Sequence, residues 1–392
     1  MKKDDFMVLK TLKRGKPIIY MDSACQSLRP KQVVDKINEY YNSYPSCGGR
    51  SYHSLSKQVD ENIDKSRNVL QKFFNARKKQ EIIFVRNTTE GINLVANSLG
   101  LKSGDIVITT DKEHNSNLIP WQILSKKGII HEVVEFGNVE ALKSRLRPEV
   151  KLVSMCHTSN LDGTSIPAKK IIKLCHENKS LVMLDGAQSA PHKKIDVQNL
   201  DVDFFVCSGH KMCGPSGTGV LYAKYKILEQ MKPFIVGGET VSDSTYTSFK
   251  LLPPPERFEA GLQNYAGIIG LGAAVEYLMK IGLDKIQKHE IMLNKKITDA
   301  LGDKVELIGP KDASLRGGIF SFNIKGQDPH EIAIMLDNSA NIMVRSGAHC
   351  VHSWFNKHKM NGSIRASLYF YNTEQDCDIF IKEMNNILNL FS

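Results

Sequence analysis

The sequence predicts an α/β fold with a mainly parallel β-sheet in a large domain, followed by a smaller α+β C-terminal domain. Three observations support this prediction. The chain has 392 residues, more than one ordinary compact domain needs. Short apolar runs alternate with helical patterns through its middle, which is typical of parallel strands joined by helices. A long helical run from residue 265 then leads into shorter mixed elements.

The expected strands are apolar, rich in β-forming residues, and mostly followed by a polar cluster. They cover residues 82–85, 106–109, 152–156, 181–184, 204–207 and 219–222. Helical patterns lie between strands, as at 91–99 and 168–177, and the run 265–279 is a plausible bridge between domains. Gly237-Gly238 and Pro253-Pro254-Pro255 interrupt the alternation, so we expect residues 237–257 to be irregular. We predict a large domain over 20–279 and a small domain over 280–392 together with 1–19.

The composition excludes several classes of protein. Hydrophobic residues make up 41% and charged residues 24%, as in ordinary globular proteins, which argues against disorder, fibrous repeats and disulfide-packed miniproteins. The longest apolar run, 267–275, is far below the roughly 18 residues that a membrane span requires. Residues 1–5 lead into charged sequence and not into the apolar segment of a signal peptide. We therefore expect a cytoplasmic protein without a membrane partner.

The net charge is basic, with 52 Lys and Arg against 42 Asp and Glu. A nucleic-acid partner requires such charge to gather on one face, whereas the basic doublets here are scattered along the chain. We therefore favour a diffuse solvated surface and expect no nucleic-acid partner. A nucleic-acid-binding or scaffold protein is the alternative from a different class.

Eight cysteines occur, and none forms a Cys-x-x-Cys pair, so zinc-ribbon and thioredoxin-like sites are not expected and no metal site is predicted. We expect reduced thiols, most of them small core residues. Cys350 differs because it follows a glycine and lies among Arg345, His349 and His352. Such a basic setting favours the reactive thiolate, although a buried thiol in a turn fits these residues equally well.

Polar clusters follow the predicted strands. In an open parallel sheet, ligands bind outside the carboxyl ends of the strands, so these clusters should line one site. They are Asn87-Thr88-Thr89, Glu113-His114-Asn115, His157-Thr-Ser-Asn160, Asp185-Gly-Ala-Gln188 and Ser208-Gly-His210-Lys211.

One of these clusters indicates a site for an anion, and another indicates a carboxylate that requires a cation or strong hydrogen-bond donors. Thr88 and Thr89 open a helix, where free amides and a hydroxyl form an anion site, although a simple N-cap is an equally good interpretation. Asp185 ends a buried strand and needs a cation or strong donors there. A metal or a protonated ring nitrogen would both serve, as would a capping role for the carboxylate.

Lys211 gains significance from its neighbours. An isolated lysine is usually a surface residue, but one in a semi-buried turn flanked by glycine can become a Schiff-base nucleophile. A phosphate site, a carboxylate, the imidazole of His114 and this amine together describe a pyridoxal phosphate pocket. Arg365 is a candidate for binding a substrate carboxylate, or else part of a structural salt bridge.

Motifs distributed along the chain resemble one known family. The sequence resembles the class V aminotransferase group of fold-type I pyridoxal phosphate enzymes. Within that group it is most similar to the cysteine desulfurases of the SUF type, which are related to selenocysteine lyases. The resemblance runs from Tyr20 to Asn372. It rests on Tyr20-Met-Asp-Ser-Ala24, Thr88-Thr-Glu-Gly-Ile-Asn-Leu-Val-Ala96, Asp185-Gly-Ala-Gln188, Ser208-Gly-His-Lys211, Phe258-Glu-Ala-Gly261 and Arg345-Ser-Gly-x-His-Cys350.

The resemblance implies a role for each site residue. Lys211 would hold pyridoxal phosphate as a Schiff base, Asp185 would pair with the pyridine nitrogen, and His114 would stack on the ring. Gln188 would reach the phenolic oxygen. The phosphate would be bound by Thr88, Thr89, Ser208 and His210. Substrate binding would fall to Asn160, Arg365 and Arg345.

The implied reaction converts L-cysteine to L-alanine, with Lys211 moving the α-proton and Cys350 keeping the sulfur as a persulfide. The resemblance also implies a homodimer and a sulfur-acceptor protein of an iron–sulfur assembly system. The compact stretch between Arg345 and Arg365 resembles the SUF branch. A selenocysteine lyase, or another class V activity such as a transaminase or a carbon–carbon lyase, is the alternative.

Three positions depart from the family pattern. Leu262 stands where the family commonly has a threonine that contacts the phosphate across the dimer. Ala348 replaces a common histidine, and residues 352–355 are not the usual continuation after the cysteine. The first departure concerns the phosphate site, and the other two concern the substrate and the partner.

Overall fold

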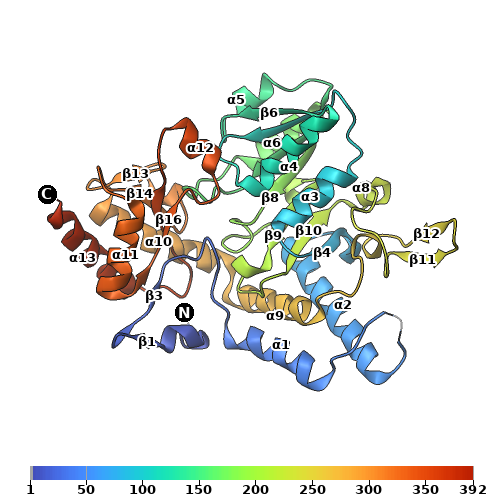
Figure 1. Ribbon diagram of the computed structural model, residues 1–392, viewed down its shortest axis with the longest axis horizontal. Coiled ribbons are helices and arrows are strands. Elements are labelled where there is room, and N and C mark those ends of the chain that lie inside the picture. The colour runs from blue at the N-terminus through green and yellow to red at the C-terminus, as the bar shows by residue number, and fades with distance from the viewer. Residues whose placement is uncertain (1–2, 50, 392) are drawn as a thin grey trace.

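The computed structural model describes residues 3–49 and 51–391. It contains a seven-stranded sheet, whose strands lie among the helices of the larger part of the chain in Figure 1. The strand order is β4-β10-β9-β8-β7-β5-β6. Each predicted strand is confirmed to within two residues. The bounds are β4 (Ile82–Val85), β5 (Ile106–Thr110), β6 (Ile130–Val134), β7 (Val150–Cys156), β8 (Leu181–Asp185), β9 (Phe204–Ser208) and β10 (Gly219–Ala223).

Strand direction brings the polar clusters together. The neighbouring strands β5, β7, β8 and β9 run parallel to one another, and β10 runs antiparallel to both β9 and β4. β4 therefore points the same way as the parallel strands, and all five clusters lie at one edge of the sheet. β6 was not predicted from the sequence. It is an edge strand whose His131 and Glu132 are only partly buried, so it lacks a continuous apolar run.

Helices cover both faces of this sheet because alternate residues of each strand point to opposite sides. Ile82 and Phe84 join one core with α2, α6 and α9, while Ile83 and Val85 join another with α3 and α4. The helices of this part are α1 (Lys31–Ser43), α2 (Ser54–Phe74), α3 (Thr88–Ser98), α4 (Ile119–Leu124), α5 (Val139–Lys143), α6 (Ala168–Glu177), α7 (Val197–Leu200), α8 (Tyr225–Gln230) and α9 (Tyr265–Ile281).

The predicted helices agree with the structure, since α3, α6 and α9 occupy the three expected segments. α9 is apolar on most of its surface and largely buried, as a helix inside a protein core should be. Of the helices that the structure describes, none alone has the length and apolar composition of a membrane span. α9 and the next helix reach that threshold only as a pair, bent by 72°.

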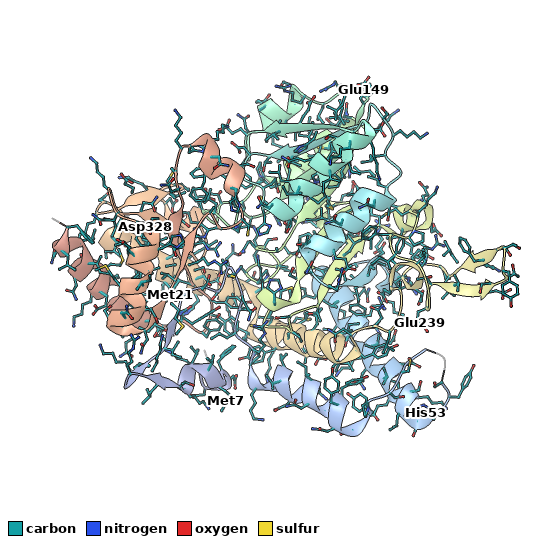
Figure 2. The ribbon with its side chains drawn as sticks, viewed as in Figure 1. Met7, Met21, His53, Glu149, Glu239 and Asp328 are labelled. Atoms are coloured by element: carbon teal, nitrogen blue, oxygen red, sulfur yellow. The ribbon has the colours of Figure 1, made fainter. Side chains whose placement is uncertain are left out.

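The C-terminal part has its own sheet and core. The sheet order is β13-β14-β17-β16, and neighbouring strands are antiparallel. Its core also contains Ile19 and Met21 from the N-terminal segment, and Met21 lies beside the C-terminal elements in Figure 2. The elements are α10 (Leu283–Leu301), β13 (Glu306–Ile308), β14 (Ile319–Asn323), α11 (Pro329–Ala340), β15 (Ile342–Met343), β16 (Arg345–Gly347), α12 (His352–Lys357), β17 (Ser363–Ser367) and α13 (Glu374–Leu390).

The N-terminal segment contacts both cores. Strand β3 (Ile19–Tyr20) pairs in parallel with β15 of the C-terminal part, whereas Phe6 and Leu9 pack into the core formed with α2 and α9. A short hairpin of β1 (Leu12–Lys13) and β2 (Lys16–Pro17) lies between them. The domain division at 279/280, with residues 1–19 assigned to the small domain, remains a prediction.

The segment 237–257 is less irregular than expected. It contains the hairpin of β11 (Val241–Ser244) and β12 (Phe249–Leu251), which projects from the body of the protein in Figure 1. Most of its side chains are exposed, including Tyr246 and Phe249. Because most of the hairpin's side chains are exposed, its sequence lacks the alternation by which strands are predicted.

Glu259, within the Phe-Glu-Ala-Gly motif, holds the sheet to α2. Both guanidinium nitrogens of Arg67 donate to its carboxylate at 2.8 Å, and the Phe84 amide donates to it at 2.7 Å. Arg67 also donates to the Ile82 carbonyl at 2.6 Å. This buried ion pair, with hydrogen bonds to both Nη atoms of Arg67 and both oxygens of Glu259, explains the glutamate of the motif as a structural residue.

Candidate active site

All the site residues predicted from the sequence line one cavity at the carboxyl edge of the sheet. Three of them, Arg345, Cys350 and Arg365, come from the C-terminal part, and the others come from the clusters that follow β4 to β9. Side chains more than 200 residues apart in the chain therefore meet at one place. The predicted residues in the cavity are Thr88, Thr89, His114, Asn160, Asp185, Gln188, Ser208, His210, Lys211, Arg345, Cys350 and Arg365.

Lys211 ends a short 3-10 turn, Gly209–Lys211, that directly follows β9. Gly209 allows this turn because a Cβ there would lie 2.2 Å from the Thr218 hydroxyl oxygen. Burial lowers the pKa of Lys211, with the nearby Arg365 adding to the effect and Asp185 opposing it. Burial therefore favours the uncharged amine, which is the form a Schiff-base nucleophile requires.

Asp185 and Gln188 are buried polar residues whose side chains have fewer hydrogen-bond partners than they could accept. Asp185 is 5% exposed and accepts a hydrogen bond from the Ala187 amide at 2.9 Å. Burial raises the pKa of this carboxyl group. The Gln188 nitrogen donates to the Ala24 carbonyl at 2.6 Å, but its oxygen has no partner among the described residues. A ligand with a cationic or donor ring would satisfy both side chains.

His114 is held in the neutral form beside Lys211. Burial, and then the charge of Lys211, lowers its pKa to about 3. Its Nδ1 accepts a hydrogen bond from the Ser116 amide at 3.1 Å. A neutral imidazole fixed by its own loop suits the stacking role that the resemblance implies.

Glu113 is a buried residue for which we predicted no role. It accepts hydrogen bonds from the Cys156 amide at 2.9 Å and from Asn117 at 2.7 Å, and burial raises its pKa to about 7. It thereby ties the loop that bears His114 to the end of β7. The sequence feature that could have indicated a role for Glu113 is its position in a polar cluster directly after a strand.

The expected phosphate end lies where α3 begins. Asn87 is the N-cap, since its side chain accepts from the Glu90 amide at 2.9 Å, so the cap is not a threonine. The Ser208 hydroxyl lies 2.7 Å from that of Thr88 and accepts from the Thr88 amide at 2.8 Å. Thr89 is exposed, and its hydroxyl lies 2.7 Å from that of Ser116. Burial lowers the pKa of His210 to about 4, which leaves a neutral ring.

Cys350 sits on a loop with unusual backbone angles. His349 and Cys350 have φ angles of 48° and 59°, in the left-handed region that residues with a Cβ seldom adopt. The loop is held to the large sheet by the Asn115 amide, which donates to the Cys350 carbonyl at 2.8 Å, and by Asn160, which donates to the His349 carbonyl at 2.7 Å. These bonds fix the thiol at the cavity.

The charge around Cys350 differs from the sequence expectation in one respect. Burial lowers the pKa of His349 to about 2, so this ring is neutral and adds no positive charge. Its Nε2 lies 2.9 Å from the Ser363 hydroxyl, which makes it a structural support of the loop. The positive charge in the cavity comes from Arg345 and Arg365 instead.

Asp22 links the two arginines and had no role in our prediction. Its carboxylate lies 3.8 Å from Arg345 and 3.6 Å from Arg365. Arg365 also donates to the Asn160 carbonyl at 2.8 Å, but its Nε has no hydrogen-bond partner among the described residues. Arg365 thus combines the predicted salt bridge with a free donor in the cavity. The available signal was the motif Tyr20-Met-Asp-Ser-Ala24.

Comparison with known proteins identifies the family to which this fold and cavity belong. Residues 19–380 match the family model Aminotransferase class-V, so the chain belongs to the class V aminotransferase family. A protein of Synechocystis sp. described as a probable cysteine desulfurase is 39% identical over 402 residues, covering 100% of this chain and 96% of the relative.

Solved structures agree with this assignment. The apo cysteine desulfurase of Thermococcus onnurineus NA1 matches with a TM-score of 0.92 at 37% identity, over 95% of each chain. The S-sulfonic acid form of the Escherichia coli cysteine desulfurase CsdA matches with a TM-score of 0.89 at 29% identity, over 99% of this chain and 98% of that one. The predicted fold class and the resemblance to cysteine desulfurases are confirmed.

Proposed function

We propose that the protein is a pyridoxal phosphate-dependent cysteine desulfurase that converts L-cysteine to L-alanine and takes up the sulfur as a persulfide on Cys350. The observation that carries this proposal is the meeting of Lys211 and Cys350 in one cavity, with Asp185 buried beside them. A lysine and a carboxylate suit the cofactor, whereas a thiol in the same cavity suits a sulfur acceptor. Other class V activities give the thiol no role.

The cavity residues suit pyridoxal phosphate. Asp185 would pair with its ring nitrogen, His114 would stack on the ring, Gln188 would contact the ring oxygen and Lys211 would be the attachment point. The phosphate would be held at the start of α3 by Thr88, Thr89, Ser208 and His210. When bound, the group supplies an electron sink that acidifies the α-proton of an amino acid.

The protein's own groups would move the proton and accept the sulfur. The Lys211 amine takes the proton from the substrate α-carbon, for which burial and the lowered pKa prepare it. The Cys350 sulfur attacks the substrate sulfur, so an S–S bond forms while the bond between the substrate's β-carbon and its sulfur breaks. The carbon fragment keeps the electron pair of that bond, its β-carbon takes up the proton that the Cys350 thiol gave up, and Lys211 returns the α-proton. The products are L-alanine and the Cys350 persulfide.

The substrate carboxylate would be bound by Arg365, with Arg345 and Asn160 nearby. Arg365 is 3% exposed and retains an unpaired Nε donor. A carboxylate would give that donor a partner and would compensate a positive charge that Asp22 meets only at 3.6 Å. Arg345 is the more exposed of the two arginines, so it would act at the mouth of the cavity.

We further propose a cytoplasmic homodimer that passes sulfur to an acceptor protein of an iron–sulfur assembly system. The exposed aromatic side chains of Tyr246 and Phe249 on the projecting hairpin favour burial against another chain. Leu262 is exposed as well, as expected of a residue at such an interface. His352 and Ser353, just after Cys350, are exposed and would meet the acceptor.

The test is to supply L-cysteine to the cofactor-loaded protein and to measure L-alanine and protein-bound sulfane sulfur. Wild type should form both, and Cys350→Ala should bind cofactor but form neither. Cys47→Ala is the matched control, because Cys47 is exposed and does not line the cavity. Absence of alanine from loaded wild type would exclude the function. Faster turnover of selenocysteine that survives Cys350→Ala would identify a selenocysteine lyase instead.

A further inference from the structure

Three cysteines line the cavity, and they differ in their surroundings. Cys156 is buried, burial raises its pKa well above the ordinary value, and its sulfur lies 3.6 Å from the Lys112 carbonyl. It therefore stays a protonated core thiol. Cys25 and Cys350 are only half-buried, so the cavity offers two accessible thiols and not one. The mechanism above uses Cys350 alone.

The backbone around Cys25 is firmly held. The Ala24 amide donates to the Ser367 hydroxyl at 3.0 Å, and the Ala24 carbonyl accepts from Gln188 at 2.6 Å. The Cys25 amide donates to the Asp22 carbonyl at 3.1 Å. The segment is thus joined both to the small sheet and to the end of β8, which keeps the Cys25 thiol at the cavity.

The Cys25 sulfur has a cationic partner. Arg345 Nη1 donates a hydrogen bond to it at 3.2 Å. A cationic donor at this sulfur suits the negative charge that Cys25 Sγ carries when it attacks as a thiolate. Arg345 comes from β16, the strand that leads into the Cys350 loop. The segment from Arg345 to Cys350 thus carries the Cys350 thiol and also donates the hydrogen bond to the Cys25 thiol.

Both thiols interact with the same lysine. Lys211 interacts electrostatically with Cys25 and with Cys350, and Arg365 interacts with Cys25. Arg365 also keeps its Nε unpaired among the described residues although it is 3% exposed. A buried donor without a partner in the shared cavity indicates that an anionic group is bound there.

We propose that Cys25 is a second sulfur-carrying residue, which accepts the sulfane sulfur from Cys350 inside the cavity. This inference rests on the proposed function. The Cys25 thiolate attacks the terminal sulfur of the Cys350 persulfide, a new S–S bond forms on Cys25, and the bond to Cys350 breaks. Cys350 leaves as a thiolate and takes up the proton released by Cys25. The exchange requires no external oxidant or reductant.

The consequence is storage of two sulfur atoms per chain. Once Cys350 has passed its sulfur to Cys25, it is free to react with a second substrate molecule before an acceptor arrives. Wild type without an acceptor should therefore bind about twice as much sulfane sulfur per chain as Cys25→Ser. The first turnover should yield alanine in both proteins.

The experiment incubates the holoenzyme with L-cysteine and no acceptor, blocks all sulfur groups with an alkylating reagent, and maps persulfides on peptides by mass spectrometry. We expect sulfane sulfur on Cys350 and Cys25 in wild type, on Cys350 alone in Cys25→Ser, and on neither in Cys350→Ala. Cys47, exposed and outside the cavity, is the internal control and should stay unmodified.

The other outcomes separate this inference from the proposed function. Sulfur on Cys350 but never on Cys25 in wild type overturns the inference and leaves the desulfurase intact. Equal labelling of Cys25 and Cys47 overturns it too, because the sulfur would then have moved through solution. Labelling of Cys25 in Cys350→Ala excludes a relay from Cys350. If no cysteine carries sulfur and no alanine forms, the proposed function itself fails.

Discussion

The backbone amide of Asn115 donates a 2.8 Å hydrogen bond to the carbonyl oxygen of Cys350. Asn115 directly follows His114, so the imidazole expected to stack on the cofactor and the thiol expected to accept sulfur are anchored by neighbouring residues. Asn160 adds a second bond of 2.7 Å from the large sheet to the same loop. The position of the thiol is therefore set by the sheet and not only by its own loop.

Asn160→Ala should loosen the Cys350 loop. The substitution removes the bond to the His349 carbonyl, and a hydrogen bond of this kind contributes about 1 kcal/mol. We expect faster alkylation of Cys350 by iodoacetamide and faster hydrogen exchange over residues 347–352. Asn97→Ala, an exposed residue on α3, is the control and should change neither rate. Equal alkylation rates in wild type and Asn160→Ala would contradict this view of the loop.

Lys211→Ala should lose the visible absorbance of lysine-bound pyridoxal phosphate, because the attachment point is removed. Lys193→Ala is the matched control: this lysine is half-buried and burial lowers its pKa to about 8, but it does not line the cavity. The measurement is the visible absorbance spectrum of each variant after reconstitution with pyridoxal phosphate. An unchanged spectrum in Lys211→Ala, or its loss in Lys193→Ala, would place the cofactor on a different residue.

His349 should make the protein sensitive to acid. The pKa of His349 is about 2 in the folded protein and 6.5 ordinarily. Between these two values the unfolded chain therefore binds a proton at His349 and the folded protein does not. The contribution of this group to the free energy of unfolding is fully present above pH 6.5. Below pH 6.5 the free energy of unfolding falls by about 1.4 kcal/mol per pH unit because of this group. His349→Gln should lose less stability than wild type between pH 6.5 and pH 4.5. Parallel stability curves for the two proteins, measured by urea unfolding, would contradict this.

Glu259→Gln should strongly destabilise the fold. It leaves Arg67 buried without its counter-charge, and breaking one side of a buried ion pair costs about 3–5 kcal/mol. Asp299→Ala is the control because it breaks an exposed pair with Lys295, which should cost less than about 1 kcal/mol. Chemical unfolding monitored by circular dichroism measures both. A loss in Glu259→Gln no larger than the control's would show that the motif glutamate is not structural.

The sequence was sufficient to predict the sheet and the cavity because their signals are local. Each of the predicted strands is a buried apolar run, and the polar residues after β4, β5, β7, β8 and β9 meet because the ends of strands that point the same way share one edge. β6 escaped prediction because it is a half-exposed edge strand, and the β11–β12 hairpin because its side chains face solvent.

The remaining features depend on distant contacts. The ion pairs of Asp22 with Arg345 and Arg365 join residues more than 300 positions apart, which no local pattern reveals. Cys25 resembled the core thiols in sequence, and only the fold brings it to Arg345. The neutral state of His349 likewise results from the burial of its ring beside Ser363, whereas its sequence neighbours suggested a charged ring.

The most direct test of the central claim is a single-turnover reaction of the loaded enzyme with L-cysteine, followed by peptide mapping of bound sulfur and quantification of alanine. We predict one L-alanine for each sulfur atom bound, with Cys350 as the first cysteine to carry it. Alanine formation with unmodified Cys350 at every time point would contradict the assignment of this residue as the sulfur acceptor.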